Sequence, residues 1–244
     1  MKTAVVLAAG RGTRMGALTD TTPKSLLPVA GRPLIEHVLR GFARAGVRRA
    51  VVVIGYLGDR IEADLGDGAR LGMEIAYCRQ ARADGTAHAL LLAEHSLGRE
   101  PFALSWGDVL VTAGFYSELI EAFARRPCDA LIAVNDVDDP WRGAAVYVDG
   151  DGRVSRLVEK PPRGTSTTRW NNAGVLILTA LALDYARALG ASARGEYELP
   201  QAIAQMVRDG RDVRALPVRG PWSDVGTPAD LAAAQAWFAA GDGG

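Results

Sequence analysis

A short loop near the start of the sequence combines residue types that bind phosphate groups. An apolar run, residues 5–9, ends at Gly10, and the loop that follows holds a second glycine, a hydroxyl and two arginines up to Arg14. Lys24 follows ten residues later. Glycines let the backbone turn sharply and expose N–H groups to an anion, and Arg and Lys add positive charge. Taken alone, the stretch also fits an ordinary strand-to-helix turn with solvated charges.

The spacing of the glycines argues against two common phosphate loops. Gly10, Gly12 and Gly16 do not fit G-x-G-x-x-G, and no acidic residue closes a clear second strand to hold a ribose, which disfavours a nicotinamide site. Lys24 lacks the glycine framing of G-x-x-x-x-G-K-[ST], so a P-loop is not expected. We expect backbone N–H groups, Arg14 and Lys24 to hold phosphate instead.

Two aspartates stand where a sheet could present them to a metal. Asp108 follows the strand-like run 101–106, at the edge where open α/β sheets bind ligands, and Asp224 lies between a late strand and the last helix. Either residue alone would also suit a helix cap or a turn. Carboxylates are good ligands for Mg²⁺, so the two together with a phosphate loop predict the protein ligands of a substrate-bound magnesium ion.

A further charged pair, Glu159 and Lys160, ends a strand-like run. Such a pair is typical of a solvated sheet edge, but Pro161 stops the strand where Lys160 could reach inward. Lysine is scarce and otherwise occurs at positions 2 and 24. Because the chain uses arginine almost everywhere else, a compact ammonium group is expected to be needed at 24 and 160, although chance would also explain the pattern.

Composition limits the classes of protein to which the chain can belong. The 28 Lys and Arg residues balance 28 Asp and Glu, so no global field would hold nucleic acid or an anionic membrane. Cys78 and Cys128 lie in apolar runs without metal spacing and fit reduced core residues. With no signal peptide or long apolar span, we expect a soluble cytoplasmic protein.

Apolar runs alternate with amphipathic segments through the first part of the chain. Strands are expected at 3–8, 50–54, 73–79, 101–106 and 130–134, and helices at 33–45, 59–65, 86–94 and 115–125. This alternation predicts a mostly parallel sheet covered by helices on both faces. Near residue 141 the pattern changes to an antiparallel hairpin, 143–148 with 154–159.

The motifs together resemble the sugar-1-phosphate nucleotidyltransferases, also called nucleoside-diphosphate-sugar pyrophosphorylases, and within them the thymidylyl- and uridylyltransferases. The matching pieces run in family order through nearly the whole chain, at 7–14, 23–24, 85–87, 107–108, 159–161, 172–174 and 222–227. The first piece is quite specific and the others are individually weak. Their shared order makes an accidental match very improbable.

The resemblance implies an α/β fold, Rossmann-like of the GT-A type, with a mixed, mostly parallel sheet flanked by helices and a small antiparallel insertion. It implies one domain over residues 1–240, with a nucleotide-binding part at about 1–135 and a sugar-phosphate-binding part at about 136–228. The implied reaction is Mg²⁺-dependent transfer of a nucleotidyl group from a nucleoside triphosphate, dTTP or UTP, to a hexose 1-phosphate.

Site residues also follow from the resemblance. Arg14, Lys24 and Asp108 would be catalytic, with Asp108 and Asp224 holding Mg²⁺. Gln80 and the backbone at Gly85 would read the base. Residues that would bind the substrates are Leu7, Ala8, Ala9, Gly10, Gly12, Thr13, Gln80, Gly85, Thr86, Gly107, Gly143, Glu159, Lys160 and Asn172. Of these, Gly143, Glu159 and Asn172 would contact the sugar, and Lys160 its phosphate; Asn171 beside Asn172 leaves the contacting amide open.

Three alternatives stay open. The same reaction could use GTP, CTP or ATP, or an unusual sugar phosphate. A glycosyltransferase of similar fold would carry a D-x-D motif, and Asp136-x-Asp138 has that form but follows a different strand from Asp108. A catalytically silent nucleotide-sugar sensor or scaffold should lose Arg14, Lys24 or the aspartates, and all are present.

Overall fold

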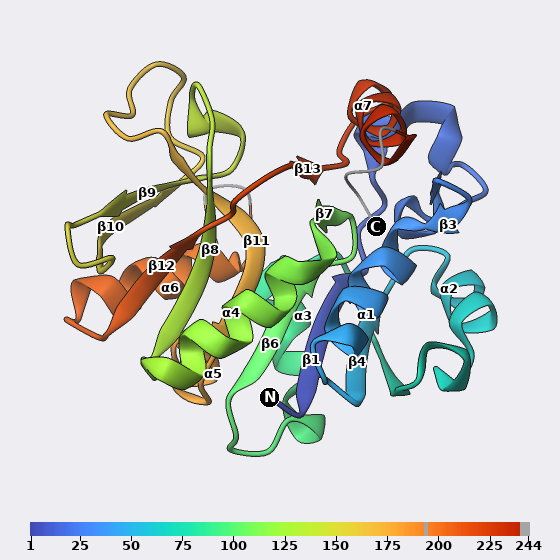
Figure 1. Ribbon diagram of the computed structural model, residues 1–244, viewed down its shortest axis with the longest axis horizontal. Helices are drawn as coiled ribbons and strands as arrows, with labels where there is room; N and C mark the ends of the chain where they lie inside the picture. Colours follow the sequence, from blue (N-terminus) through green and yellow to red (C-terminus); the bar gives the residue numbers. More distant parts are fainter. Residues whose placement is uncertain (193–194, 240–244) are drawn as a thin grey trace.

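The computed structural model describes residues 1–192 and 195–239, and a nine-stranded sheet with helices on both faces runs through it (Figure 1). One half of the sheet is parallel, in the order β6, β1, β4, β5. Its strands are β1 (Thr3–Ala8), β4 (Arg49–Ile54), β5 (Glu74–Arg79) and β6 (Phe102–Trp106). The near-continuous apolar runs of β1, β4 and β6 suit strands buried on both faces, whereas β5 at the edge of the sheet is only partly buried.

The other half of the sheet is largely antiparallel. β11 pairs with β6 on one side and with β8 on the other, both antiparallel, and β12 extends β8 in parallel. The β9–β10 hairpin joins the sheet through β11. The strands are β8 (Ala130–Asp136), β9 (Ala144–Val148), β10 (Val154–Glu159), β11 (Trp170–Leu178) and β12 (Val213–Pro217). The predicted mixed sheet with an antiparallel insertion is confirmed.

All but the last of the described helices cover the two faces of this sheet, and the last one packs beside it on short strands. The helices are α1 (Leu34–Arg44), α2 (Gly58–Leu65), α3 (Thr86–Leu92), α4 (Ala113–Arg125), α5 (Leu181–Arg187), α6 (Leu199–Arg208) and α7 (Pro228–Ala239). α1 and α4 pack together on one face, and α3, α5 and α6 pack together on the other. α1 ends just before Gly46, which takes the left-handed conformation that stops helices.

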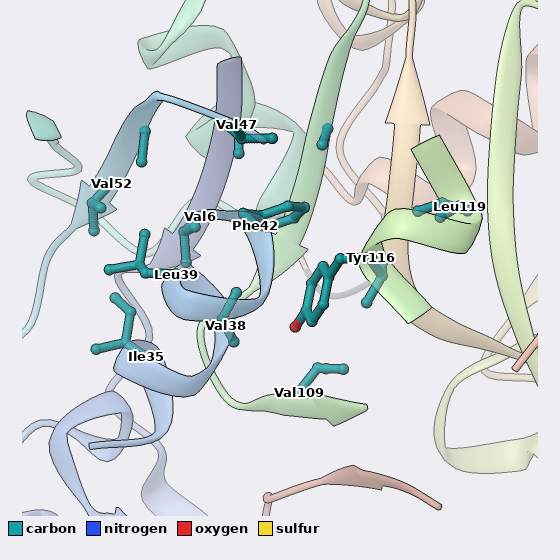
Figure 2. Packing of buried hydrophobic residues seen from close by; sticks show 14 of the residues in the cluster. Val6, Ile35, Val38, Leu39, Phe42, Val47, Val52, Val109, Tyr116 and Leu119 are labelled. Carbon is teal, nitrogen blue, oxygen red and sulfur yellow. The ribbon is translucent and has the colours of Figure 1, made fainter. Parts of the chain in front are cut away.

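Alternation along the strands divides the core between the two faces. Val6 of β1 points toward α1 and α4, and its neighbour Val5 points toward α3 and α6. On the first face, the rings of Phe42 and Tyr116 meet edge to face with centroids 4.6 Å apart (Figure 2). Gly41 makes room for this contact, because a side chain there would overlap the Tyr116 ring.

A third, smaller apolar cluster lies beneath the last helix. It is formed by Met15, Leu27, Val29, Leu34, Leu110, Val225 and Ala234, with Trp237 and Phe238 of α7 packed against it. The cluster therefore joins the loop after β1 to the segments that follow Asp108 and Asp224. No pattern in the sequence predicts it, because its members are scattered along the chain.

Two short antiparallel pairs were not predicted. β7 (Val109–Val111) pairs with β13 (Trp222–Asp224), and β2 (Pro28–Val29) pairs with β3 (Arg32–Pro33). Runs of two or three residues are too short for periodicity to reveal a strand. The β7–β13 pair forms a separate two-stranded sheet, and both of its strands contact β11.

The predicted division of the chain at about residue 135 stays a prediction, since the sheet continues across it. Residue 240, where the predicted domain ends, lies outside the described residues. None of the helices in residues 1–192 and 195–239 is both long and apolar enough to cross a membrane.

Candidate active site

Two adjoining cavities open where the parallel strands end. The small cavity, about 240 Å³, lies at the carboxyl ends of β1 and β6. The large cavity, about 750 Å³, extends from there to β9, β10 and β11. The two cavities meet along a shared wall, whose residues include Lys24, Gly85, Thr86, Trp106 and Asp108.

Most residues predicted for the nucleotide line the small cavity. They are Leu7, Ala8, Ala9, Gly10, Gly12, Lys24, Gln80, Gly85, Thr86, Gly107 and Asp108. Thr13 lines neither cavity. Ser25 was not predicted but also lines the small cavity, and its buried hydroxyl has no hydrogen-bond partner among the described residues. Its place directly after Lys24 is the only sequence signal for it.

Glycine is required at two points of this wall. Gly12 has φ +68°, and a Cβ there would lie 2.9 Å from the Cβ of Lys24. Gly85 has φ +102°, and a Cβ there would overlap the carbonyl of Tyr197. Both positions combine a backbone conformation that L side chains rarely adopt with a close approach of another segment. The shape of the small cavity therefore depends on backbone as much as on side chains.

Gln80 is buried at the end of the small cavity. Its backbone N–H donates to Ile54 O (2.8 Å), and its side-chain Nε2 donates to Gly85 O (3.1 Å) and lies 3.2 Å from His88 Nδ1. The amide nitrogen thus braces the loop at Gly85. The amide oxygen takes no part in these contacts, so it is the group that a base could meet.

Lys24 and Asp108 form an ion pair on the wall shared by the two cavities. Burial alone would lower the pKa of Lys24, but the carboxylates of Asp108 and Asp224 outweigh it and the pKa of Lys24 is raised. The ammonium group therefore stays charged across the neutral range. This is the state needed to stabilise phosphate oxygens.

Pairing of β13 with β7 brings Asp224 to Asp108, although the two lie more than a hundred residues apart in the sequence. Asp224 is the register partner of Val109, the residue after Asp108, and it opens onto the large cavity. Partial burial raises the pKa of Asp224 to about 6, and the negative charge of Asp108 adds to the effect. The two carboxylates repel each other, which favours a cation between them.

These two carboxylates fit a hard divalent cation. No group of three or more His, Cys, Asp or Glu within residues 1–192 and 195–239 is placed to hold a metal by itself. Mg²⁺ is commonly bound through one or two carboxylates, with waters and substrate phosphates as its other ligands. Asp108 and Asp224 would hold the ion in this way, and their role as the metal ligands stays a prediction.

Arg14 lines the large cavity beside these acids, and its guanidinium group lies against the backbone of Gly226. A Cβ on Gly226 would lie 2.8 Å from Nη2 of Arg14. The next residue, Met15, is 1% exposed and belongs to the third cluster. The loop is thus fastened by Met15, with Arg14 directed to the cavity.

Lys160 lies in the part of the large cavity nearest to β10. Its Nζ is 3.4 Å from Glu198 Oε1 and 3.6 Å from Glu159 Oε1, and its backbone N–H donates to Gly143 O (2.7 Å). Lys160 has φ +43°, an uncommon value outside glycine. The structure therefore brings together three predicted sugar-side residues and adds Glu198, which was missed.

Glu198 is 5% exposed and directly precedes α6. Pro200 near the start of this helix marks its beginning and was the available sequence signal. The backbone N–H of the next residue, Leu199, donates to Thr86 Oγ1 (2.9 Å). The segment around Glu198 thus contacts Lys160 on one side and the wall of the small cavity on the other.

The two tandem asparagines both line the large cavity. Asn172 Oδ1 accepts from the backbone N–H of Gly174 (3.0 Å), and Asn171 Nδ2 donates to Asn135 Oδ1 (2.9 Å). A side chain on Gly143 would overlap Asn171 Oδ1, so Asn171 packs against the predicted sugar contact at Gly143. The choice of Asn172 for the sugar stays a prediction.

The arrangement suits chemistry between two phosphorylated molecules. Arg14, Lys24 and the two aspartates lie close to one another on the wall of the large cavity, and Lys160 lines the same cavity. A glycine-lined small cavity adjoins the first group. One phosphorylated molecule would lie across the small cavity, and a second would be held by Lys160.

Comparison with known proteins gives a consistent result. The sequence profile of the family described as Nucleotidyl transferase matches residues 3–240. A glucose-1-phosphate thymidylyltransferase of Streptomyces antibioticus is 35% identical over 93% of this chain and 64% of its own length, so the chain spans less than two thirds of that relative. A UTP–glucose-1-phosphate uridylyltransferase of Haloferax volcanii is 34% identical over 93% of this chain and 92% of its own length.

Solved structures share the architecture. A crystal structure of a UDP-glucose pyrophosphorylase complexed with UDP-glucose superposes with a TM-score of 0.88 and covers 99% of both chains. Its sequence is 22% identical to this chain, so the likeness concerns the fold alone.

Proposed function

The chain belongs to the nucleotidyl transferase family, and from this we propose that it transfers a nucleotidyl group from a nucleoside triphosphate to a hexose 1-phosphate. The products are a nucleoside-diphosphate sugar and pyrophosphate. One observation carries the proposal. The β7–β13 pair places Asp224 beside Asp108 and Lys24, in the same cavity that contains Lys160.

The reaction needs little acid–base chemistry from the protein. An oxygen of the sugar phosphate attacks the α-phosphorus of the triphosphate in line, the bond to the β-phosphate breaks, and pyrophosphate leaves with that electron pair. A phosphate monoester has a second pKa of about 6 and is largely dianionic at neutral pH, so no general base is required. The work that remains is positioning and charge neutralisation.

The residues of the site match this requirement. Lys24 and Arg14 stabilise negative charge on the phosphates, Lys160 holds the attacking phosphate, and the glycines of the small cavity let backbone approach the nucleotide. Asp108 and Asp224 would hold Mg²⁺, and the bound ion would supply Lewis-acid neutralisation of charge on the phosphate oxygens. Both aspartates are ionised when they bind the metal.

We favour dTTP or UTP as the nucleotide. Gln80 keeps its amide oxygen clear of its contacts with Gly85 and His88, and such an oxygen can accept from the ring N–H of thymine or uracil. The two relatives described above are named as a thymidylyl- and a uridylyltransferase acting on glucose 1-phosphate. Glucose 1-phosphate is therefore the first acceptor to test.

The experiment is pyrophosphate release with Mg²⁺ across a grid of nucleoside triphosphates and sugar 1-phosphates. We expect release with dTTP or UTP and no release when the metal is chelated. Binding of triphosphate without release on any acceptor would favour the silent sensor. Absence of both binding and release would reject the proposal.

A further inference from the structure

A tryptophan flanked by two arginines stands at the mouth of the large cavity. Trp141 and Arg142 belong to the short 3₁₀ turn Pro140–Arg142, and Arg163 belongs to the loop after β10. The Cζ atoms of Arg142 and Arg163 lie 5.1 and 5.6 Å from the centre of the Trp141 ring, and all three residues line the cavity. We call these three residues the cationic rim.

The two segments of the cationic rim are fastened to each other. Asp139 Oδ2 accepts a hydrogen bond from the backbone N–H of Gly164 at 2.7 Å, which ties the 3₁₀ turn to the loop after β10. Trp141 is 37% exposed, so its ring lies at the surface, where both guanidinium groups contact it. Cation–π contacts of this kind orient a guanidinium without neutralising it.

The two arginines of the rim are not engaged in ion pairs, although acids lie near them in the sequence. Asp138 is paired with Arg169 (3.4 Å), and Asp139 accepts a backbone N–H at Oδ2 while its Oδ1 has no hydrogen-bond partner among the described residues. Among the ion pairs of the described residues, none includes Arg142 or Arg163. By contrast, Lys160, which lines the same cavity, lies against Glu159 and Glu198.

The cavity thus has two separate cationic positions on its sugar side. Lys160 serves the 1-phosphate under the proposed function, on which this inference rests. The rim lies next to Gly143, where the body of the sugar is predicted to lie, and the sugar phosphate needs no further charge there. A guanidinium offers a planar fork that matches a carboxylate, and a neutral hexose has no group that requires it.

We propose that the cationic rim recognises a second anionic group on the acceptor, so that the substrate class is a sugar 1-phosphate that also carries a carboxylate. Arg142 and Arg163 bind the carboxylate, and Trp141 holds them in position. The rim then decides which acceptor is used, and the transfer step itself is unchanged.

The experiment compares acceptors that differ by the acid group. Pairs are glucuronic acid 1-phosphate with glucose 1-phosphate, and N-acetylmuramic acid 1-phosphate with N-acetylglucosamine 1-phosphate. The measured quantity is the ratio of kcat/KM for the acid to kcat/KM for its neutral parent, at fixed nucleotide and low salt. We expect a ratio of about ten or more for at least one pair, since a paired charge can discriminate by that factor.

The variant Arg142→Gln/Arg163→Gln should bring that ratio down to about one, while Arg125→Gln, an exposed arginine of α4 outside both cavities, should leave it unchanged. A wild-type ratio at or below one for both pairs would overturn the inference and leave the proposed function intact. An equal loss for acid and neutral acceptors in the double variant would also overturn it, because it would show general attraction of phosphate. Lack of pyrophosphate release with every acceptor would reject the proposed function and the inference with it.

Discussion

The two sides of the site are built in different ways. The small cavity is walled by strand ends and by glycines such as Gly12 and Gly85, where another segment comes within van der Waals contact of the backbone. The sugar side of the large cavity is walled by charged side chains, among them Lys160 with its two glutamates and the arginines of the cationic rim. One side therefore relies on main-chain shape and the other on placed charges.

This difference has a consequence for specificity. A wall made of backbone tolerates few substitutions, because nearly any side chain at its glycines would strain or block it. A wall made of exposed side chains can change its charge pattern without disturbing the fold. We therefore expect the sugar side to hold most of the selectivity of this protein, and the predictions below test that contrast.

The largest effect is expected at the acid that both sides share. Asp108→Asn removes a predicted metal ligand and the partner of Lys24, so kcat should fall by about a thousandfold. The melting temperature should change little, because Asp224 still faces Lys24. The control is Asp151→Asn, which alters an exposed turn carboxylate. Near-normal Mg²⁺-dependent turnover in Asp108→Asn would remove Asp108 from the metal site.

A glycine substitution should affect the nucleotide side selectively. Gly12→Ala forces a Cβ onto a backbone with φ +68° and against Lys24, so kcat/KM for the triphosphate should fall by about tenfold to a hundredfold. Gly114→Ala, an exposed glycine in α4 with open space around it, is the matched control. Equal values of kcat/KM for the triphosphate in Gly12→Ala and Gly114→Ala would contradict the contrast between the two sides.

A charge substitution should affect the sugar side selectively. Glu198→Gln removes one of the two acids beside Lys160, and we expect KM for the sugar phosphate to rise by about tenfold while KM for the triphosphate stays the same. Equal increases in both values would mean that Glu198 acts through the contact of Leu199 with Thr86.

Gln80 is the one side chain of the small cavity expected to choose between bases. Gln80→Ala should lower the preference among nucleoside triphosphates by roughly three- to tenfold, the value of one hydrogen bond. Competition between UTP, dTTP and CTP at fixed acceptor measures it. If the preference is unchanged, the base is read elsewhere.

The smallest effect concerns stability without metal. The pKa of Asp224 is about 6 in the folded state, above its value of about 3.9 in an unfolded chain. The folded state therefore favours the protonated carboxyl, and the resulting contribution to the free energy of unfolding is present below pH 4 and is lost as pH rises through 6. Asp224→Asn does not titrate and should melt a few degrees higher than wild type at pH 7.5. The gain should shrink toward pH 5, and a gain independent of pH would contradict this origin.

Much of the framework follows from the sequence. The apolar runs before Gly10 and at residues 50–54, 101–106 and 130–134 specify strands, because each run has the length and burial of a central strand. The order of the motifs supplies the family. Most of the predicted nucleotide-side residues gather at the small cavity; Arg14 lines only the large cavity, and Thr13, which begins a 3₁₀ turn, lines neither.

The rest depends on long-range pairing that no local pattern encodes. β13 is three residues long, yet it decides where Asp224 lies. Glu198 becomes a neighbour of Lys160 only when α6 packs on β10. The cationic rim likewise needs two loops, tied between Asp139 and Gly164, to meet in space.

The third apolar cluster also sets an order in time. Met15 is made near the start of synthesis, but Val225 and Ala234, which enclose it, are made more than two hundred residues later. At about 5 to 20 residues per second, this delay is roughly 10 to 40 s on the ribosome. The parallel strands can form in the meantime, and Met15 can first pack against earlier members of the cluster such as Leu27, Val29 and Leu34. The cluster itself can be completed only after the last helix has been translated, so this packing beside Arg14 is finished late.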